Sequence, residues 1–367
     1  MEKSSENKIY RAIGLMSGTA MDGIDAALIE TDGYNHIKSI AFYGVTHDPI
    51  LRQSLKAQLN KNDYDQGVER NFTLAQVQVI DDLLSKVDLK ASDIDIVGFH
   101  GQTTHHDPDN GITVQMVDGE LLADALGIDV VYDFRKNDMR YGGQGAPLLP
   151  VYHRALVRRA DIELPVVILN MGGVGNITYI NSDEMIAFDT GPANALIDDW
   201  VKNHTGQDFD AGGLIASQGI VDNDVLAQFL SLPYFEKPYP KSLDRNDFKN
   251  ISVEGLSLED GATTLTAMTV QSIAAAIAFC PEPPKSIYVT GGGRHNSFIM
   301  SQIKMATKCQ IYSVDDLGWN GDAIEAEGFA YMAVRSLLGQ NLTFPKTTGC
   351  DMPTTGGVHI ISKSKVA

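Results

Sequence analysis

Asp189 stands where a carboxylate can act as a base. It ends an apolar run in the sequence FDTGPAN, directly before a Thr-Gly-Pro turn and the expected start of a helix. Reacting groups gather at strand ends in α/β enzymes, so we predict that Asp189 is a general base. An aspartate in this position also serves as a helix cap or forms an Asx-turn, and the pattern alone leaves these roles open.

Glu325, in DAIEAEGFAY, is a second candidate catalytic carboxylate. On a helix it shares a face with Gly328, and a glycine there lets the helix approach its neighbour closely. A solvated surface glutamate is the alternative interpretation, and Glu327 competes for the same role. Separate substitution of the two glutamates distinguishes them.

A polar cluster follows the predicted buried strand 94–99. It comprises His100, Gln102, Thr103 and His106. Side chains of these types form hydrogen bonds to the hydroxyl and amide groups of a sugar. A metal site is disfavoured, because His105 and His106 are adjacent rather than spaced on one face and no third ligand is close in the sequence.

Two further segments carry residues suited to a polar substrate. Asp133 and Arg135, in DFR, supply a carboxylate and a guanidinium fork, and such a fork binds a carboxylate through two parallel hydrogen bonds. An ion pair between lobes is an equally good explanation of these two residues. The loop 142–147, which contains Gly143 and Gln144, is expected to line the same site.

Three glycine-rich loops are spread along the chain. Residues 14–30 have the pattern of a strand, a small polar turn and a second strand; MGGVGNITYI repeats it after 166–170, and GGGRHNSFIM follows the strand 286–290. Glycine has no Cβ, so the backbone N–H groups of such loops can come close to an anion. An ordinary hairpin turn explains any one loop, but the repetition favours an anion site.

The order of these loops resembles the two phosphate segments and the adenosine segment of the sugar kinase, actin and heat-shock ATPase superfamily. Five blocks resemble, in the same order, the anhydro-N-acetylmuramic acid kinases: GLMSGTAMDGID, FHGQTTHHDP, DFRKNDMRYGGQGAPLLP, FDTGPANALIDDW and DAIEAEGFAYMA. The resemblance extends from Gly14 to about Leu338. It implies an α/β protein with a two-lobed actin-like ATPase (ribonuclease H-like) fold and a central nucleotide cleft.

The resemblance also implies ATP and Mg²⁺ as cofactors. The residues expected around the nucleotide are Gly18, Thr19, Ala20, Met21, Asp22, Gly23, Ile24, Asp25, Gly172, Gly173, Asn176, Gly291, Gly292 and Gly293. Asp22 and Asp25 are the expected metal-orienting residues, acting through water. The chain departs from the wider superfamily at residues 13–16, where Ile, Gly, Leu and Met stand in place of an early acidic residue.

The reaction that the resemblance implies couples hydrolysis to phosphorylation. Asp189 activates a water that attacks the anomeric carbon of 1,6-anhydro-N-acetylmuramic acid, the anhydro bridge opens, and O6 takes the γ-phosphoryl group of ATP. The product is N-acetylmuramate 6-phosphate, in cell-wall recycling, and Arg135 is expected to face the lactyl carboxylate of the sugar. A kinase for another sugar on the same fold and an actin- or chaperone-type ATPase are the alternatives.

The length of 367 residues favours two lobes, because single cores stop growing at about 250–300 residues. We predict an N-terminal lobe over 1–140, rejoined by 340–367, and a C-terminal lobe over 141–339. The alternation of strand and helix patterns indicates α/β architecture.

Composition limits the partners. A net charge of −18 without a stripe of Lys and Arg disfavours nucleic acid. No stretch reaches the roughly 20 uninterrupted apolar residues of a membrane helix, and the N-terminus is polar, so we expect no membrane contact and a cytoplasmic protein. The three cysteines lack the number and spacing of a disulfide framework. A homodimer is expected, because symmetric dimers are the commonest assembly.

Overall fold

The computed structural model describes residues 8–18, 21–243, 248 and 251–363. Contacts divide the chain into two units: Met1–Asp161 with Ala323–Ala367, and Ile162–Asp322. These divisions differ from the predicted ones at 140/141 and 339/340. The reason is that α5 (Pro150–Arg159) and α10 (Ile324–Leu337) pack on elements of the first unit.

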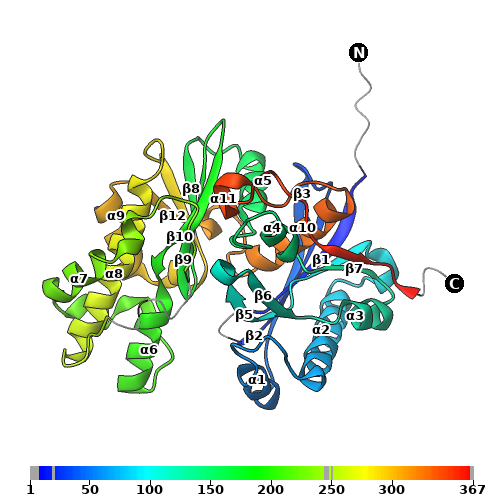
Figure 1. Ribbon diagram of the computed structural model, residues 1–367, viewed down its shortest axis with the longest axis horizontal. Helices are drawn as coiled ribbons and strands as arrows, with labels where there is room; N and C mark the ends of the chain where they lie inside the picture. The colour runs from blue at the N-terminus through cyan, green and yellow to red at the C-terminus, as the bar shows by residue number, and fades with distance from the viewer. Residues whose placement is uncertain (1–7, 19–20, 244–247, 249–250, 364–367) are drawn as a thin grey trace. The chain divides into compact units, whose positions relative to one another are not determined.

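The first unit contains a six-stranded sheet (Figure 1). Its remaining helices and strands are β1 (Tyr10–Met16), β2 (Gly23–Thr31), β3 (Ile37–Thr46), α1 (Pro49–Lys56), α2 (Gln66–Lys86), β4 (Ile96–Phe99), β5 (Gln102–Asp107), β6 (Ile112–Met116), α3 (Gly119–Leu126), β7 (Asp129–Tyr132), α4 (Lys136–Arg140), α11 (Pro345–Thr348) and β13 (Val358–Ile360). The strand order is β13-β7-β4-β1-β2-β3, and β5 and β6 pair separately. Strands β1, β2 and β3 are antiparallel neighbours, whereas β4 and β7 run parallel to β1.

The two faces of this sheet are covered differently. Ile13 and Leu15 on β1 pack with Phe72 and Ile80 of α2 in one buried cluster. The opposite face carries α10, which lies directly on the backbone of β1 and β4. A Cβ on Gly14 would lie 1.8 Å from the carbonyl oxygen of Ala326. Glycine in the strand therefore lets the helix dock at backbone distance.

The second unit contains a five-stranded sheet. Its elements are β8 (Val166–Met171), β9 (Val174–Ile180), β10 (Met185–Pro192), α6 (Asn194–Thr205), α7 (Asn223–Leu230), α8 (Leu258–Ala278), β11 (Ser286–Thr290), α9 (Ser297–Thr307) and β12 (Gln310–Ser313). The strand order is β10-β9-β8-β11-β12, with β8, β9 and β10 antiparallel and β11 and β12 parallel to β8.

Both units thus repeat one plan: three antiparallel strands in chain order, then two parallel strands added beside the first. The first unit adds β13, antiparallel to β7, at the edge of its sheet. The tight turns of the hairpins allow antiparallel pairing, and the helical crossovers allow the parallel pairs. The predicted α/β class is confirmed, and the duplicated sheet is the arrangement implied by the resemblance to the two-lobed ATPases.

Helix α8 forms the centre of the second unit. Among the described residues it alone is long and apolar enough to cross a membrane by length and composition, and 67% of its apolar window is buried inside the unit. Met268 and Ile273 are fully buried in the core cluster that also contains Val167 and Phe188 of the sheet. The packing is that of a core helix.

Candidate active site

A row of polar residues crosses the sheet of the second unit near its loop edge. Asp189 on β10 is opposite Asn176 on β9, Asn176 is opposite Asn170 on β8, and Asn170 is opposite Thr290 on β11. Residues directly opposite one another share a face of the sheet. Sheet pairing therefore brings together Asp189 and Asn176, which lie thirteen positions apart in the chain. Asn170 and Thr290 were not among the predicted site residues, although each is a polar residue at the end of an apolar strand.

Two of the predicted loops touch at this edge. Strands β8 and β11 are parallel neighbours, so the chain leaves both at the same edge, into 172–173 and 291–293. Gly291 has a φ of +77°, and a Cβ there would lie 2.5 Å from Oδ1 of Asn170. A Cβ on Gly293 would lie 2.6 Å from Cβ of Met171. Glycine at 291 and 293 is therefore required for the loops to pack together.

The start of helix α6 fixes the loop at 172–173. The backbone N–H of Asn194 donates to the carbonyl oxygen of Gly172 at 2.9 Å, and that of Ala193 donates to Gly173 at 3.0 Å. The side-chain amide of Asn194 donates to the carbonyl of Met171 at 2.8 Å. Asn194 follows Pro192 and Ala193 in the FDTGPAN block, and the sequence reasoning did not select it.

Four glycines have no local structural explanation. All 34 glycines of the chain are described, and 30 have either a positive φ or a described atom within 3.4 Å of the position that a Cβ would take. The remaining four are Gly18, Gly172, Gly173 and Gly292. They all lie in the three loops predicted to approach an anion. Among the described residues neither a positive φ nor a close contact requires glycine at these positions, and a backbone of this kind is open to approach by a ligand.

Asp189 is half-buried and held by the segment 234–243. Its Oδ2 accepts a 2.8 Å hydrogen bond from the backbone N–H of Leu243. Its own N–H donates to the carbonyl of Lys241 at 3.0 Å, and the hydroxyl of Tyr234 donates to its carbonyl. Helix α6 has Ala193 as its N-cap and no side-chain cap. The helix-cap interpretation of Asp189 is therefore wrong.

Lys241 anchors that segment. Its ammonium donates to the carbonyl of Tyr234 at 3.0 Å and lies 4.5 Å from the ring centroid of Tyr234 and 4.7 Å from that of Phe279. The side chain is buried, and burial lowers the pKa of Lys241 to about 8. The charge is thus held by one carbonyl and aromatic faces.

The first glycine loop belongs to the first unit and is tied to β5. The hydroxyl of Ser17 donates to Oε1 of Gln102 at 2.8 Å, and Nε2 of Gln102 donates to the carbonyl of Gly18 at 3.2 Å. Gln102 is completely buried. The structure thus gives Gln102, predicted to bind the substrate, the role of positioning the loop. Thr19 and Ala20 lie outside the described residues.

His100 and Arg135 join two of the predicted substrate segments. Nδ1 of the buried His100 donates to the carbonyl of Gly101 at 2.8 Å, so Nε2 is the acceptor for Nη2 of Arg135 at 2.8 Å. Burial, and then the charge of Arg135, hold the pKa of His100 well below its usual range. Nη1 of Arg135 donates to the carbonyl of Gly145 at 2.6 Å. The guanidinium thus links a neutral histidine to the loop 142–147.

Asp133 has a local partner. Its carboxylate forms an ion pair with Lys136, three residues later, at 3.1 Å. The alternative of an ion pair between lobes is therefore wrong for Asp133, because both partners belong to the first unit.

The loop 142–147 is folded around Asp138, which the sequence reasoning missed. Oδ2 of Asp138 accepts from the N–H of Gly145 at 2.7 Å, and Oδ1 accepts from the hydroxyl of Thr348 at 2.6 Å. A Cβ on Gly143 would lie 2.1 Å from Oδ2. Gln144 donates its N–H to the carbonyl of Thr348, and its buried Oε1 has no partner among the described residues. An amide oxygen of this kind is free to accept from a ligand.

The comparisons with known proteins decide the family. The model of the anhydro-N-acetylmuramic acid kinase family matches residues 10–361. Proteins named anhydro-N-acetylmuramic acid kinase from Rhizorhabdus wittichii and Zymomonas mobilis are 51% and 47% identical to this chain, over 95% of it and 98% and 100% of their own lengths. The chain belongs to the anhydro-N-acetylmuramic acid kinase family.

Solved structures of more distant proteins are also similar to this family member. A gluconate kinase from Lactobacillus acidophilus matches with a TM-score of 0.47 and 11% identity over 98% of this chain and 94% of its own. The activator of 2-hydroxyisocaproyl-CoA dehydratase from Clostridium difficile matches with a TM-score of 0.46 and 12% identity, over 88% and 94%.

The two glutamates of α10 have different surroundings in this anhydro-N-acetylmuramic acid kinase family member. Glu327 is buried, and its Oε2 accepts a 2.6 Å hydrogen bond from the hydroxyl of Tyr152. Burial, and then the charge of Glu327, raise the pKa of Tyr152 well above its usual range. Glu325 is half-buried in the first turn of the helix rather than fully solvated. Glu327 therefore has a partner inside the first unit, and Glu325 stays the predicted catalytic residue.

The two predicted metal-orienting aspartates lie at the end of the β1–β2 hairpin. Asp22 is exposed, and Asp25 is half-buried, opposite Met16 on β1 and Gly44 on β3. Among the described residues no three His, Cys, Asp or Glu side chains are grouped to hold a metal ion. Mg²⁺ is usually held by one or two carboxylates, water and substrate phosphates, so this donor set fits a water-mediated role.

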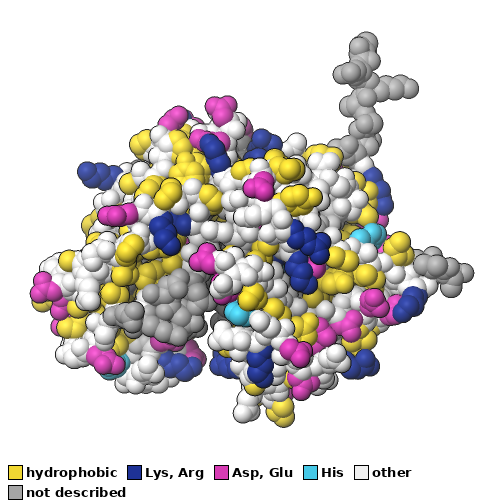
Figure 2. Space-filling view, in the orientation of Figure 1, with side chains coloured by type: hydrophobic (Ala, Val, Ile, Leu, Met, Phe, Trp, Pro, Cys, Tyr) yellow, Lys and Arg dark blue, Asp and Glu magenta, His cyan; other side chains and the backbone are white. Residues whose placement is uncertain are grey.

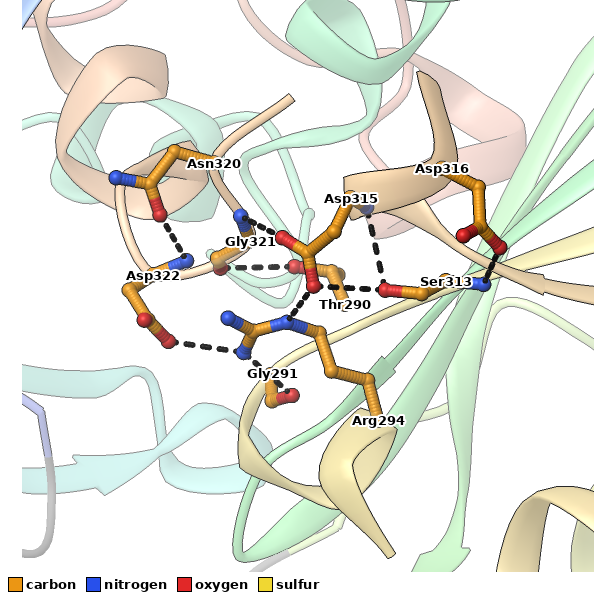
Figure 3. Close-up of polar contacts among 9 residues, drawn as sticks. All are labelled: Thr290, Gly291, Arg294, Ser313, Asp315, Asp316, Asn320, Gly321 and Asp322. Carbon is orange, nitrogen blue, oxygen red and sulfur yellow. Dashed lines mark hydrogen bonds and ion pairs between the residues drawn. The ribbon is translucent and has the colours of Figure 1, made fainter. Parts of the chain in front are cut away.

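Arg294 holds the third glycine-rich loop, 291–293, through contacts to the loop itself and to residues further along the chain (Figure 3). Its guanidinium contacts Asp315 and Asp322, each at 2.8 Å, and donates to the carbonyl of Gly291 at 3.1 Å. A Cβ on Gly321 would lie 2.4 Å from Nε. Arg294 adjoins the three glycines in the sequence, yet its carboxylate partners are more than twenty residues away, which is why the sequence reasoning missed it.

Proposed function

We propose that this protein is an ATP-dependent kinase that opens 1,6-anhydro-N-acetylmuramic acid hydrolytically and phosphorylates O6, giving N-acetylmuramate 6-phosphate in peptidoglycan recycling. The family match over residues 10–361 supports the reaction. The nucleotide assignment is supported most by one observation: the four glycines without a local explanation all lie in the three predicted nucleotide loops.

We assign the backbone of 18–25, 172–173 and 291–293 to the nucleotide. Gly18, Gly172 and Gly173 would let backbone N–H groups approach the phosphates, and the loop at Gly291 would face the adenosine. Asn176 adds a side-chain amide from the same row as Asp189. Asp22 and Asp25 would orient Mg²⁺ through water, and the ion would neutralise charge on the phosphate oxygens.

The proposed chemistry uses Asp189 as the base. Its carboxylate takes a proton from a water, the water oxygen bonds to the anomeric carbon, and the bond from that carbon to O6 breaks. O6 keeps the electron pair, attacks the γ-phosphorus of ATP and releases ADP. The hydrogen bond from Leu243 to Oδ2 fixes the orientation of the carboxylate during the proton transfer. Glu325 is the second proposed catalytic carboxylate.

We place the sugar beside the segments joined by Arg135. Thr103, Asp133, Gly143 and Gln144 supply polar groups around the buried pair of His100 and Arg135. A guanidinium that already contacts Nε2 of His100 and the carbonyl of Gly145 is held in one orientation, which suits recognition of a carboxylate. Gln102 does not contact the sugar in this proposal; it positions the first glycine-rich loop through its hydrogen bonds with Ser17 and Gly18.

We also propose that the protein is a cytoplasmic homodimer without nucleic acid partners. On the face drawn in Figure 2, the Lys and Arg side chains of the described residues are scattered among Asp and Glu and form no continuous stripe. The net charge of −18 disfavours a polyanionic partner.

A coupled assay with water labelled with ¹⁸O tests the function. Release of ADP that requires the anhydro sugar, with one ¹⁸O at the anomeric carbon and phosphate on O6, is the expected result. ADP release that requires a different sugar would replace the substrate assignment. Slow hydrolysis that no sugar changes would favour an ATPase of the actin or chaperone type and would contradict the kinase.

A further inference from the structure

A pocket in the first unit is lined by three arginines, and no predicted site residue lines it. Its volume is about 200 Å³, and it lies between α5, α10 and the turn from β2 to β3. Arg154 and Arg158 come from α5 and Arg335 from α10. The other polar lining residues are Tyr34, Asn35, Tyr331 and Gln340. Helical spacing puts Arg154 and Arg158 on one face of α5.

Arg335 is buried and rigidly held. Nη1 donates to the carbonyl of Gly33 at 2.9 Å, and Nη2 and Nε donate to the carbonyl of Asn341 at 2.7 and 3.0 Å. These acceptors are neutral. They orient the guanidinium and leave its positive charge uncompensated.

Arg154 is half-buried and its charge is also uncompensated. The guanidinium lies 4.9 Å from the ring centroid of Phe344. Burial, and then the charges of Arg158 and Arg335, lower the pKa of Arg154. The three arginines thus repel one another within one pocket.

No carboxylate forms an ion pair with this cluster, although the charge of Asp32 acts on Tyr331 in its lining. Among the described residues none of the three arginines has an Asp or Glu oxygen within 4.0 Å. Asp32, in the adjoining turn, directs Oδ1 to the N–H groups of residues 34–36. Arg158 has a partial explanation at the C-terminal end of α5, where a cation favours the helix dipole. That explanation does not cover Arg154 or Arg335.

We propose that this pocket binds a phosphate group, either as inorganic phosphate or as the phosphoryl group of a small metabolite. Three guanidiniums offer more positive charge and more hydrogen-bond donors than a single carboxylate can use. A phosphate dianion, with its higher charge and its several acceptor oxygens, matches them better. The volume is below the 300–1,000 Å³ of sites for larger ligands, which favours a small anion. No residue of the proposed nucleotide loops lines the pocket, and the inference does not depend on the proposed reaction.

The test compares three proteins by titration calorimetry with inorganic phosphate at constant ionic strength. They are the wild type, the double variant Arg154→Gln/Arg158→Gln, and the control Arg159→Gln, which removes one exposed charge from the same helix but none from the pocket. Phosphate binding at the nucleotide loops is common to all three, so the difference between proteins isolates the pocket. The double variant should bind at least about tenfold more weakly than the other two, since charge-assisted hydrogen bonds are lost.

Two further measurements complete the test. Glycerol 3-phosphate is compared with inorganic phosphate, and glycerol alone is the blank. Tighter binding of glycerol 3-phosphate indicates that the ligand is a phosphorylated metabolite, and equal binding indicates that it is free phosphate. Equal phosphate affinity in all three proteins overturns the proposal. A double variant that keeps its phosphate affinity but no longer forms a dimer also overturns the proposal. In that case the pocket binds an acidic segment of a second copy of the chain. If the double variant fails to fold, Arg158→Gln alone, at an exposed position, should still show part of the loss.

Discussion

The backbone N–H of Leu243 donates a 2.8 Å hydrogen bond to Oδ2 of Asp189, although the two residues are 54 positions apart. Tyr234 and Lys241, from the same segment, bond the backbone of Asp189. The candidate base is therefore held by the segment 234–243 as well as by its own strand. Positioning of this kind is what a proton transfer within hydrogen-bond reach requires.

Replacement of Asp189 by Asn should abolish most of the turnover and preserve the fold. The amide oxygen still accepts from Leu243, but it takes no proton from water, so we expect kcat to fall by about 10²–10⁴. ADP release with the anhydro sugar measures the loss, and ATP binding should be retained. Asp183→Asn, on the exposed β9–β10 turn, is the control. An Asp189→Asn enzyme with normal kcat would remove the role.

Stability should increase with pH through the titration of Lys241. Its pKa is about 8 in the native state and about 10.4 when unfolded. Between these values the unfolded chain binds more protons, so the free energy of unfolding rises with pH, by up to about 1.4 kcal/mol per unit. Below pH 8 both states are protonated, and the native state carries the cost of the buried charge.

Urea unfolding of Lys241→Met between pH 7 and 10 checks this expectation. The variant should lack the part of the increase that Lys241 contributes. Lys304→Met, at an exposed position of α9, should keep it. Identical pH profiles for the wild type and Lys241→Met would show that Lys241 titrates as an ordinary lysine.

Two glycine substitutions should separate ligand approach from packing. A Cβ on Gly172 has no atom closer than 3.7 Å, so Gly172→Ala should leave stability nearly unchanged and raise the KM for ATP by about tenfold or more. Gly291→Ala places a Cβ 2.5 Å from Asn170 at a φ of +77°, and should lower the free energy of unfolding by more than about 1 kcal/mol.

Thermal unfolding and ATP kinetics on both variants make the comparison. Gly339→Ala is the matched control, because Gly339 has a φ of +66° and no atom within 4 Å of a Cβ. It should lose stability without a change in KM. A Gly172→Ala enzyme that is unstable but binds ATP normally would indicate a structural glycine.

Replacement of Arg135 by Lys should weaken sugar binding. An ammonium cannot reach both Nε2 of His100 and the carbonyl of Gly145, so one buried acceptor loses its donor. We expect the KM for the anhydro sugar to rise about tenfold while the KM for ATP stays constant. Steady-state kinetics with each substrate varied measures the difference. Arg140→Lys, at an exposed position of α4, should behave as the wild type.

The two glutamates of α10 should respond differently to substitution. Glu327→Ala leaves the buried hydroxyl of Tyr152 without its acceptor and should lower the free energy of unfolding by about 1–3 kcal/mol. In a Tyr152→Phe background the same change should cost less. Glu325→Gln should reduce kcat with little effect on stability. Chemical unfolding and kinetics of both variants test the assignment, and the opposite pattern would exchange the two roles.

Much of the fold was predictable because its signals are local. Strand and helix periodicities, the glycine turns and the alternation that indicates α/β architecture each occupy a short stretch of chain. Asp189 and Asn176 were predicted from such stretches, and sheet pairing places them opposite each other. The division of the chain by contacts differs from the predicted boundaries, because α5 and α10 have no local mark of the unit on which they pack.

The sequence by itself determined which residue types stand at strand ends and in glycine turns, since neighbouring residues fix backbone geometry. Only the tertiary structure decided their hydrogen-bond partners: Leu243 donates to Asp189, Arg135 to His100, and Arg294 to Asp315. It also separated the glycines needed for packing, such as Gly291, from those that packing leaves unexplained, such as Gly172. Contacts across 21 to 54 positions depend on how the elements pack in space, and no pattern within a short stretch of chain encodes that packing.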